Sequence, residues 1–567
     1  MRSIFVVAGA ALGMSAQLVS SLPAGAQTPE PTAQREGTGG EFVVGYDGSA
    51  ADAAAAIGSA GGAVIDVNEA IGIALVTSPD AAFLETVRAV DGVTGAAHNH
   101  SVGTAHPGMP HRFVEERPSA AEGVASSGSP LAASKPGKAH NDDPLASLQW
   151  DMAMIGATAG GAHRRSTGRG VTVGIIDSGI DASHPDIAPN FSRDLSRNFT
   201  IDIPAIDGPC EAATCIDPVD VDEGGRGTHV AGIVGAARNG LGIAGVAPDT
   251  TLVNVRAGQD SGFFFLFETV AALTYAGDAS LDVVNMSFFV DPWLYNCDSA
   301  DDYVSGAVTA EQIAEQAFAR QTLTAALEYA HARGVTLVGA AGEQHTNLAA
   351  PTRTDATSPN FPAGSEQVRV VTNDCPSLPL EGPHVIQVSS VGPSTTKADF
   401  SNYGSPSIEV AAPGGFFRDF VGTPQFQTPG NLVLSTYPLE VAIGQGLADE
   451  NGDPISAFSV KSCDSSGRCG FYTYQQGTAV AAAHVSGVAA LIIEAHGKRR
   501  SSSYSLDPDT VGSIIGATAS DHACPAGGVE IYIDEGRPAE FNAVCEGTTA
   551  VNGLYGEGIV AAAAAVD

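Results

Sequence analysis

Two side chains of complementary type, Asp177 and His229, mark where this sequence could do proton-transfer chemistry. Asp177 ends the apolar run VTVGIID, and a carboxylate buried at a strand end needs a partner because an unpaired buried charge is costly. His229 lies in GGRGTHVAGIVGA, at the start of a run of small residues that predicts a tightly packed helix. A carboxylate that orients an imidazole makes it an effective general base. We therefore predict that the fold pairs Asp177 with His229.

A third segment, GTAVAAAHVSGVAAL, has the form of a catalytic helix without a reactive group at its tip. Ala479 follows Gly-Thr at the position where a nucleophile would stand, and a methyl group cannot attack a carbonyl carbon. Ser486 lies about 10 Å farther along the predicted helix, too far to take its place. Thr478 is adjacent in sequence but would point away from the helix tip in a different direction. The sequence thus predicts a base without a nucleophile.

These three segments, in this order, resemble the subtilisin-like serine proteases of the S8 family. That family has Asp in an Asp-Ser/Thr-Gly turn, His in a Gly-Thr-His-Val-Ala-Gly run and Ser in Gly-Thr-Ser-Met-Ala-Ala-Pro-His-Val. The resemblance covers roughly residues 144–566 and includes the final GLYGEGIVAAAAAV. It implies a three-layer α/β fold around a parallel sheet, with Asp177 and His229 as triad members and Ala479 in place of the nucleophilic Ser.

The resemblance also assigns the oxyanion position to Glu343. The segment VTLVGAAGEQHTN, residues 335–347, matches a family segment that ends Ala-Gly-Asn, where the Asn amide donates to the transition-state oxyanion. An ionised carboxylate cannot donate, and its charge repels an oxyanion. In a subtilisin, which supplies the reference values, loss of the nucleophile lowers turnover about 2 × 10⁶-fold and loss of the oxyanion donor about 10²–10³-fold. Both departures predict negligible peptidase activity.

The expected function is that of a secreted S8-family pseudoprotease that keeps a cleft for a peptide or protein ligand. The alternative is an active secreted serine endopeptidase that hydrolyses peptide bonds by an Asp-His-Ser mechanism, supported by the family match and by the intact Asp177 and His229. Neither chemistry requires a cofactor. Structural calcium is frequent in the family, but no compact oxygen-ligand loop can be assigned in this sequence, and no metal ligand is predicted.

Two segments resemble the walls of the family's substrate cleft. GQDSGFFFLF, residues 258–267, resembles the edge segment that pairs with the substrate backbone, and places Gly262 there. NMSFF, residues 285–289, resembles the opposite wall, with Ser287 facing the cleft. A peptide could bind between them by strand addition without being cut. The other interpretation of GFFFLF is an ordinary hydrophobic core strand.

These side chains need a rigid scaffold, and the sequence predicts one. Short runs of Val and Ile without polar alternation are typical of strands buried on both faces of a parallel sheet. Helical stretches lie between several of these runs, and the working residues of such a sheet gather at the carboxyl ends of its strands. The predicted strands are VTVGIID, TLVNVR, DVVNMS, VTLVGAA, VIQVSS and IEVAA.

The region before this sheet divides into three predicted parts. Residues 1–26 have a positive start, an apolar run and a small-residue cleavage pattern, as in a secretory signal peptide. Residues 41–103 follow a β-α-β-β-α-β order, a ferredoxin-like α+β pattern, and resemble the inhibitory propeptide that occupies the cleft of S8 proteases. Residues 104–143 are rich in Pro, Ser, Gly and Ala and predict a linker. The peptidase-like domain then covers residues 144–567.

The composition disfavours some classes of binding partner and indicates an oxidising compartment. The 567-residue chain has 27 Lys and Arg against 63 Asp and Glu, a net charge of −36, which disfavours nucleic acid and anionic membranes as partners. Eight cysteines in an exported chain predict disulfides. Cys210 with Cys215 and Cys463 with Cys469 are near neighbours that could close loops, and the pairs Cys524–Cys545 and Cys297–Cys375 follow by elimination.

Overall fold

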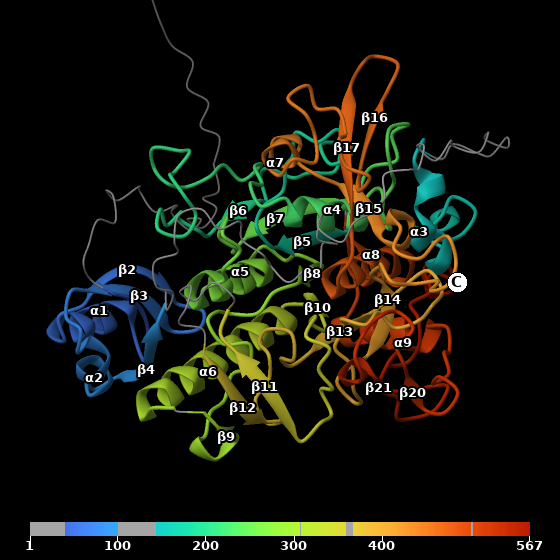
Figure 1. The fold of residues 1–567 in the computed structure, drawn as a ribbon. Helices are drawn as coiled ribbons and strands as arrows, with labels where there is room; N and C mark the ends of the chain where they lie inside the picture. The colour runs from blue at the N-terminus through green and yellow to red at the C-terminus, as the bar shows by residue number, and fades with distance from the viewer. Residues whose placement is uncertain (1–39, 100–142, 307, 359–366, 501–502) are drawn as a thin grey trace, which may run out of the picture. The chain divides into compact units, whose positions relative to one another are not determined.

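The computed structural model describes residues 40–99, 143–306, 308–358, 367–500 and 503–567. These residues belong to one compact unit, 37–567, which contains a small N-terminal domain and a larger domain (Figure 1). The predicted signal peptide, 1–26, and nearly all of the predicted linker, 104–143, lie outside the described residues, so those two boundaries remain predictions.

The larger domain is built on a parallel sheet, as the apolar runs predicted. Among the described residues this sheet has seven strands in the order β14-β13-β10-β8-β5-β7-β6, and every neighbouring pair is parallel. Six strands coincide with the predicted runs, and the short edge strand β6 was not predicted. The strands are β5 (Thr172–Ile176), β6 (Arg197–Asn198), β7 (Thr251–Arg256), β8 (Val283–Met286), β10 (Thr336–Ala340), β13 (Val385–Val391) and β14 (Val410–Pro413).

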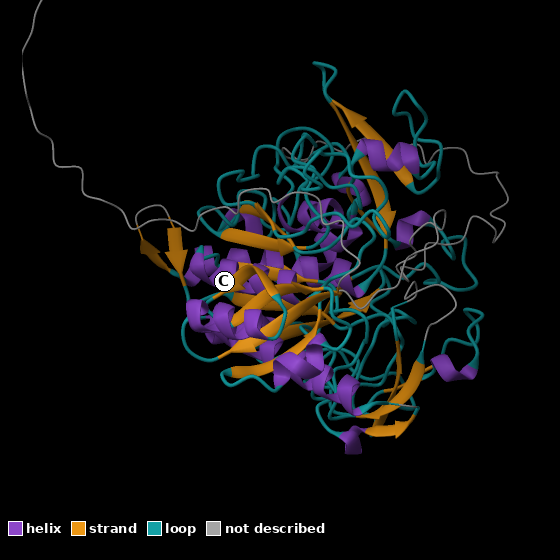
Figure 2. Cartoon of the chain, turned by 90° about the vertical axis from the view of Figure 1, so that its left-hand side faces the viewer, coloured by secondary structure: helices purple, strands orange, loops and turns teal. Residues whose placement is uncertain are grey.

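Helices cover both faces of this sheet, which explains why its strands do not alternate with polar residues (Figure 2). Alternate residues serve two separate cores: Val283 and Val338 pack with one set of helices, and their neighbours Val284 and Leu337 pack with the other. The first core contains α4 (Arg226–Gly235), α8 (Thr478–His496) and α9 (Pro508–Thr518), and the second contains α5 (Leu266–Asp278) and α6 (Ala310–Ala332). The predicted three-layer α/β fold is confirmed.

Helix α8 is the central helix of the first core. By length and hydropathy it could cross a membrane, yet 89% of its most apolar window is buried inside the protein. It packs against α4, α9 and strands β8, β10 and β13. Burial within the protein core therefore accounts for its apolar composition.

The other described elements form small sheets and short helices around this body. One three-stranded sheet contains β9 (Tyr303–Ser305), β11 (Thr352–Ala356) and β12 (Val368–Thr372), and another contains β15 (Val433–Thr436), β16 (Ser459–Cys463) and β17 (Cys469–Gln475). The short elements are α3 (Trp150–Ile155), α7 (Leu439–Gly444), α10 (Ala562–Ala565), β18 (Lys498–Arg500), β19 (Ser503–Ser505), β20 (Val529–Glu530), β21 (Ala543–Val544), η1 (Ala146–Leu148), η2 (Ala162–Arg164), η3 (Ala300–Asp302), η4 (Pro429–Asn431) and η5 (Ala539–Phe541).

The N-terminal domain has the predicted β-α-β-β-α-β order. Its antiparallel sheet has the strand order β2-β3-β1-β4, and its two helices pack on one face around Ile57, Phe83 and Val87. The elements are β1 (Gly40–Tyr46), α1 (Ala50–Ser59), β2 (Ala63–Asn68), β3 (Ile73–Ser78), α2 (Phe83–Arg88) and β4 (Val93–His98).

The free face of this small sheet packs on α5 and α6. Phe318 of α6 is buried against Gly45 and Gly95, and a methyl group added at either glycine would overlap its ring. Asn99, next to the end of β4, accepts a hydrogen bond from the Phe267 N–H at the start of α5 (2.9 Å) and donates to Glu268 (3.0 Å). The two domains thus share a core as well as polar contacts.

All four predicted disulfides are present. They join Cys210 to Cys215, Cys297 to Cys375, Cys463 to Cys469, and Cys524 to Cys545, and none of the eight cysteines is free.

The packing of Phe318 predicts that substitution of a glycine beside its ring lowers the stability of the protein, whereas substitution of an exposed glycine does not. Gly95→Val should lower the free energy of unfolding by about 1–3 kcal/mol, because the new side chain must displace a buried ring. Gly58→Ala, in the exposed part of α1 where an added methyl group meets nothing within 4 Å, should be neutral or slightly stabilising. Urea denaturation of both variants tests this, and equal destabilisation would contradict the packing.

Candidate active site

Asp177 lies at the carboxyl end of β5 and is fixed on all sides. Its side chain is 1% exposed, and the Ser178 N–H donates to Oδ1 (2.8 Å). The backbone N–H groups of Ala257 and Gly258 donate to its carbonyl oxygen (3.3 and 3.1 Å). The remaining oxygen, Oδ2, lies 3.3 Å from Nε of Arg226. The partner that Asp177 requires is therefore a guanidinium group.

The predicted pairing of Asp177 with His229 stays a prediction. His229 is buried on α4, with Nε2 3.1 Å from the Thr473 carbonyl oxygen. The first turn of α4 docks on the turn after Asp177, where Gly227 lies against the Gly179 carbonyl so closely that no side chain would fit. This contact fixes the helix turn that carries both Arg226 and His229.

Arg226 cannot perform the role predicted for an imidazole. A guanidinium has five donors and no acceptor, and it keeps its proton at any pH at which a protein is folded. Arg226 also donates to the carbonyl oxygen of Ser287, so it connects the end of β5 to the segment after β8. The sequence did contain the signal, because Arg226 stands within the quoted motif GGRGTHVAGIVGA.

A buried carboxylate that the sequence analysis missed holds the start of α4. Asp222 is 3% exposed and accepts hydrogen bonds from the N–H groups of Gly225 and Thr228, both at 2.8 Å. The Ser178 hydroxyl also donates to it (3.0 Å). Burial raises the pKa of Asp222, and the hydrogen bonds from Thr228 oppose that shift. Asp222 thus links the first turn of α4 to the turn that follows Asp177.

The tip of α8 carries Ala479, as the sequence predicted, and beside it stands the Glu343 carboxylate. Ala479 is 7% exposed. The Thr478 N–H donates to Oε1 of Glu343 (2.9 Å), and the Gly342 N–H donates to the Thr478 hydroxyl oxygen (3.1 Å). Helix N-termini bind anions through free N–H groups and the helix dipole. Glu343 is thus the hydrogen-bond acceptor at this helix end, at the position that the resemblance assigns to an oxyanion donor.

Neither hydroxyl considered as a substitute nucleophile is available. Ser486 is fully buried and donates to Oδ1 of Asn285 and to the Ala482 carbonyl, both at 3.0 Å. The Thr478 hydroxyl accepts the hydrogen bond from Gly342. Both side chains have structural roles within the described core.

The edge segment that contains Gly262 forms a tight turn whose donors are already used. The Gln259 N–H donates to the Phe263 carbonyl (2.9 Å), and the Gly262 N–H donates to the Gln259 carbonyl (2.8 Å). The Ser261 N–H donates to Oδ1 of Asp207 (2.9 Å). These three N–H groups are therefore already bonded within the turn, and peptide binding by strand addition at this edge stays a prediction.

The opposite wall, with Ser287, is joined directly to this segment. Phe288 stacks on Phe264 with ring centroids 3.9 Å apart, and both rings are buried. The Phe264 N–H donates to Oδ2 of Asp291 (2.7 Å), while the Asp291 N–H donates to the Phe264 carbonyl (2.9 Å). The GFFFLF segment is therefore buried at these positions, but it is a turn that leads into α5 and not the core strand that was the other interpretation.

Carboxylates gather beside the edge segment within the described residues. Asp202, Glu211 and Asp217 each bring an oxygen within 4.8 Å of the others, and Glu211 forms a second such group with Glu223 and Asp260. Asp202 is 4% exposed, and neither of its carboxylate oxygens accepts a hydrogen bond. Such oxygens are the ligands that Ca²⁺ prefers. The group fits the structural calcium that the family resemblance implies, although its members are too dispersed in sequence to suggest a loop.

One buried arginine balances only part of this charge. Arg256 contacts Asp217 (2.6 Å) and Asp260 (2.7 Å). Burial, followed by the charge of Asp217, raises the pKa of Asp202 to about 6 and that of Glu223 to about 7. Burial raises the pKa of Asp260 to about 8 even though Arg256 opposes the shift. The cluster therefore favours either protonation or a bound cation.

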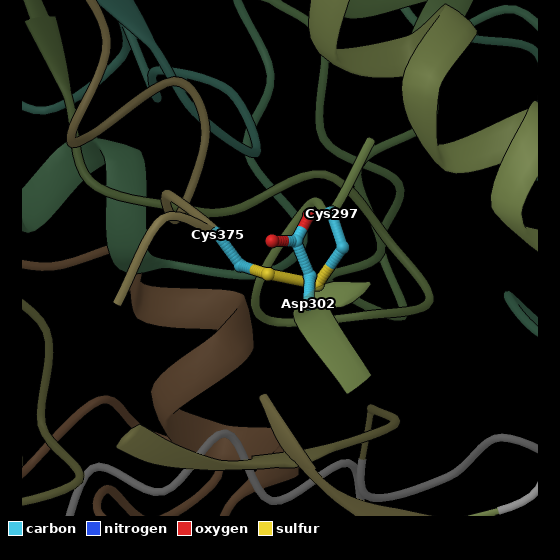
Figure 3. A group of neighbouring side chains, drawn as sticks. All are labelled: Cys297, Asp302 and Cys375. Carbon is cyan, nitrogen blue, oxygen red and sulfur yellow. A yellow bond between two sulfur atoms is a disulfide. The ribbon is translucent and has the colours of Figure 1, made fainter. Parts of the chain in front are cut away.

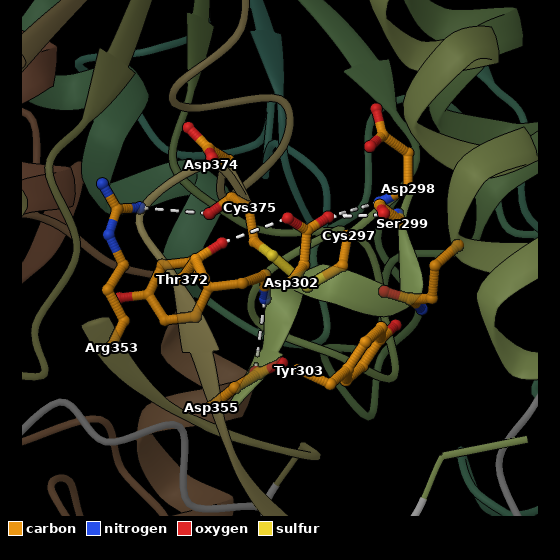
Figure 4. The surroundings of a disulfide bond; sticks show 12 residues. Cys297, Asp298, Ser299, Asp302, Tyr303, Arg353, Asp355, Thr372, Asp374 and Cys375 are labelled. Atoms are coloured by element: carbon orange, nitrogen blue, oxygen red, sulfur yellow. Dashed lines mark hydrogen bonds between the residues drawn. A yellow bond between two sulfur atoms is a disulfide. The ribbon is translucent and has the colours of Figure 1, made fainter. Parts of the chain in front are cut away.

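A further group of potential metal ligands has a structural role. Cys297, Asp302 and Cys375 lie together, but the two sulfurs are bonded to each other (Figure 3). The Asp302 carboxylate accepts hydrogen bonds from the Ser299 N–H (3.0 Å) and the Thr372 hydroxyl (3.1 Å) (Figure 4). This group ties the segment after β8 to β12.

Comparisons with known proteins agree with this fold. The family model for peptidase S8, the subtilase family, matches residues 168–558, and the model for the fervidolysin N-terminal prodomain matches residues 24–97. Fervidolysin from Fervidobacterium pennivorans is 25% identical over 362 residues, 62% of this chain and 38% of that protein. A thermophilic serine proteinase from Bacillus sp. strain AK1 is 29% identical over 246 residues, 43% of this chain and 44% of that protein. The matched region thus spans less than half the length of either relative.

Solved structures show the same fold at low sequence identity. The crystal structure of the epidermin leader peptide processing serine protease from Staphylococcus aureus has a TM-score of 0.59 and 18% identity, covering 93% of this chain and 98% of that chain. The crystal structure of fervidolysin has a TM-score of 0.55 and 21% identity, covering 94% of this chain and 62% of that chain.

The carboxylate cluster predicts a calcium-dependent pH profile. With a chelator present, the melting temperature should fall as the pH rises from about 4 to about 8, because the folded chain retains protons that the unfolded chain has already released. Because the pKa values of Asp202, Glu223 and Asp260 are raised in the folded chain, these groups stabilise the fold fully at pH values below their ordinary pKa values. This stabilisation is lost as the pH rises through about 6, 7 and 8. Saturating Ca²⁺ should remove most of the decline in calorimetric scans.

A matched pair of variants tests the assignment. Asp202→Asn should weaken the calcium effect, whereas Asp91→Asn, at an exposed acid outside the cluster, should leave it unchanged. The same calcium effect in both variants would exclude this cluster as the site.

Proposed function

Because this chain belongs to the subtilase family, we propose that it is an exported, catalytically silent member that binds polypeptides without cleaving them. One observation carries the proposal: the tip of α8 carries Ala479, which has no nucleophilic atom, beside the Glu343 carboxylate. Ala479 and Glu343 stand at the nucleophile and oxyanion positions that the resemblance assigns. Each of these two replacements alone lowers activity strongly.

An active endopeptidase, the alternative, is supported by the family match and by the Asp177 and His229 positions in the sequence. It requires a nucleophile at the tip of α8, where Ala479 stands. Polypeptide is still the ligand class that fits the family and the attached prodomain. The S. aureus protease named above is a leader peptide processing protease, which supports the same class. Export is supported by the four disulfides, because such bonds persist in oxidising compartments.

Purified full-length protein should bind fluorescein-labelled casein without releasing labelled fragments over many hours. Fluorescence anisotropy measures the binding, and gel electrophoresis with fluorescence detection measures cleavage. Fragment release that a serine-directed phosphonate blocks would refute catalytic silence. Absence of casein binding would refute the polypeptide-binding part alone.

Restoration variants test whether the nucleophile and the oxyanion donor are the missing groups. Ala479→Ser with Glu343→Asn should restore measurable peptidase activity, because Asp177 and His229 remain as orienting carboxylate and base. His229→Gln in the double variant is the control and should abolish that activity. An inactive double variant would show that the loss extends beyond these two positions, and Arg226 beside Asp177 is then the next position to change.

Maturation offers a separate test. Without its own nucleophile the chain cannot cut the segment between the two domains, so residues 41–103 should stay covalently attached when the protein is made in a protease-deficient host. N-terminal sequencing and intact mass spectrometry measure this. A homogeneous N-terminus near Asp143 from such a host would contradict the prediction.

A further inference from the structure

Two histidines and an aspartate meet at the end of the central sheet opposite the candidate active site. His331 lies in the last turn of α6, His384 directly precedes β13, and Asp509 lies in the first turn of α9. Oδ1 of Asp509 is 3.0 Å from Nε2 of His331 and 3.9 Å from Nδ1 of His384. The sequence analysis did not find this group, because its members are far apart in the chain.

We propose that His331, His384 and Asp509 form a binding site for a divalent transition metal such as Zn²⁺. Two imidazole nitrogens and one carboxylate oxygen are a donor set typical of Zn²⁺ and its neighbours in the first transition series, whereas Ca²⁺ takes oxygen ligands. The three ligand atoms lie within 4.8 Å of one another. The protein would supply three ligands, and a water molecule could occupy the fourth coordination position.

The distances suit a tetrahedral ion after a small adjustment. Bonds of about 2.0–2.1 Å place neighbouring ligand atoms about 3.3 Å apart, and the observed separations of 3.0 and 3.9 Å lie on either side of that value. The two rings are stacked, with centroids 3.7 Å apart and planes inclined by 9°, so they must tilt for both lone pairs to reach one ion. The His331 side chain is 15% exposed and acts as the anchor, while those of His384 (39%) and Asp509 (70%) have room to move.

The backbone also indicates that the His384 position is imposed by its surroundings. His384 has φ +64°, in the left-handed region that non-glycine residues rarely adopt. Such a conformation persists only where neighbouring structure holds it, and it often marks a binding site. Here it directs the imidazole onto the His331 ring.

This site is separate from the candidate active site, and a metal ion bound there would have a structural effect. It lies where β10 and β13 begin, whereas Asp177 stands at the carboxyl end of β5. Helix α6 belongs to the core on one face of the sheet, and α9 belongs to the core on the other face. A metal bound by both helices would therefore clamp the two outer layers together at the amino ends of the strands.

Isothermal titration of chelator-treated full-length protein with ZnCl₂, in saturating Ca²⁺ to occupy the carboxylate cluster, tests the proposal. One Zn²⁺ per chain should bind in the parent and raise its melting temperature. His384→Gln and Asp509→Asn should each abolish both effects. His98→Gln is the matched control, because His98 also contacts a carboxylate, that of Glu315 (2.9 Å), but belongs to no group of three potential metal ligands among the described residues.

Titration with Co²⁺ supplies an independent readout that does not depend on stability. The parent should develop visible ligand-field absorption of a tetrahedral or five-coordinate nitrogen–oxygen site, and His384→Gln and Asp509→Asn should lack it. Circular dichroism of the two variants should match the parent, because both changes are at the surface. Zn²⁺ binding that persists in both variants, or that is lost equally in His98→Gln, would overturn the proposal and indicate adventitious binding elsewhere.

Discussion

The ion pair between Asp177 and Arg226 is the interaction that fixes the geometry of the candidate site. A carboxylate that is 1% exposed needs a partner, and Arg226 supplies a permanent positive charge beside it. The same guanidinium donates to the Ser287 carbonyl, so that the charge pair also connects the end of β5 to a predicted wall of the cleft. The ion pair therefore joins three segments of the candidate site.

The fold was predictable because its signals are local. Each buried parallel strand appears as a short run of Val and Ile, and the alternate residues of β8 and β10 do serve two cores. The order of elements in residues 41–103 was likewise readable, as were the disulfides. Parallel strands are covered by helices on both faces, so the apolar runs define the two cores and the conformations of the loops are not needed to predict them.

The site was less predictable because it depends on which residue of a motif faces which neighbour. Asp177, Ala479 and Glu343 follow directly from their elements, whereas the contact of Arg226 with Asp177 depends on how α4 docks on the turn after β5. The close contact of Gly227 with Gly179 is part of that docking, and no pattern in the sequence predicts it. The same limit applies to His331, His384 and Asp509, and to the carboxylates around Arg256, which approach one another through the fold alone.

The Glu343 side chain at the start of α8 has a consequence for stability. The first N–H groups of a helix have no acceptor within the helix, and an unsatisfied N–H group lowers the stability of the folded protein when it is buried. Glu343 supplies such an acceptor to the Thr478 N–H. The native state therefore satisfies this donor with a side chain of the same chain and does not depend on a ligand to do so.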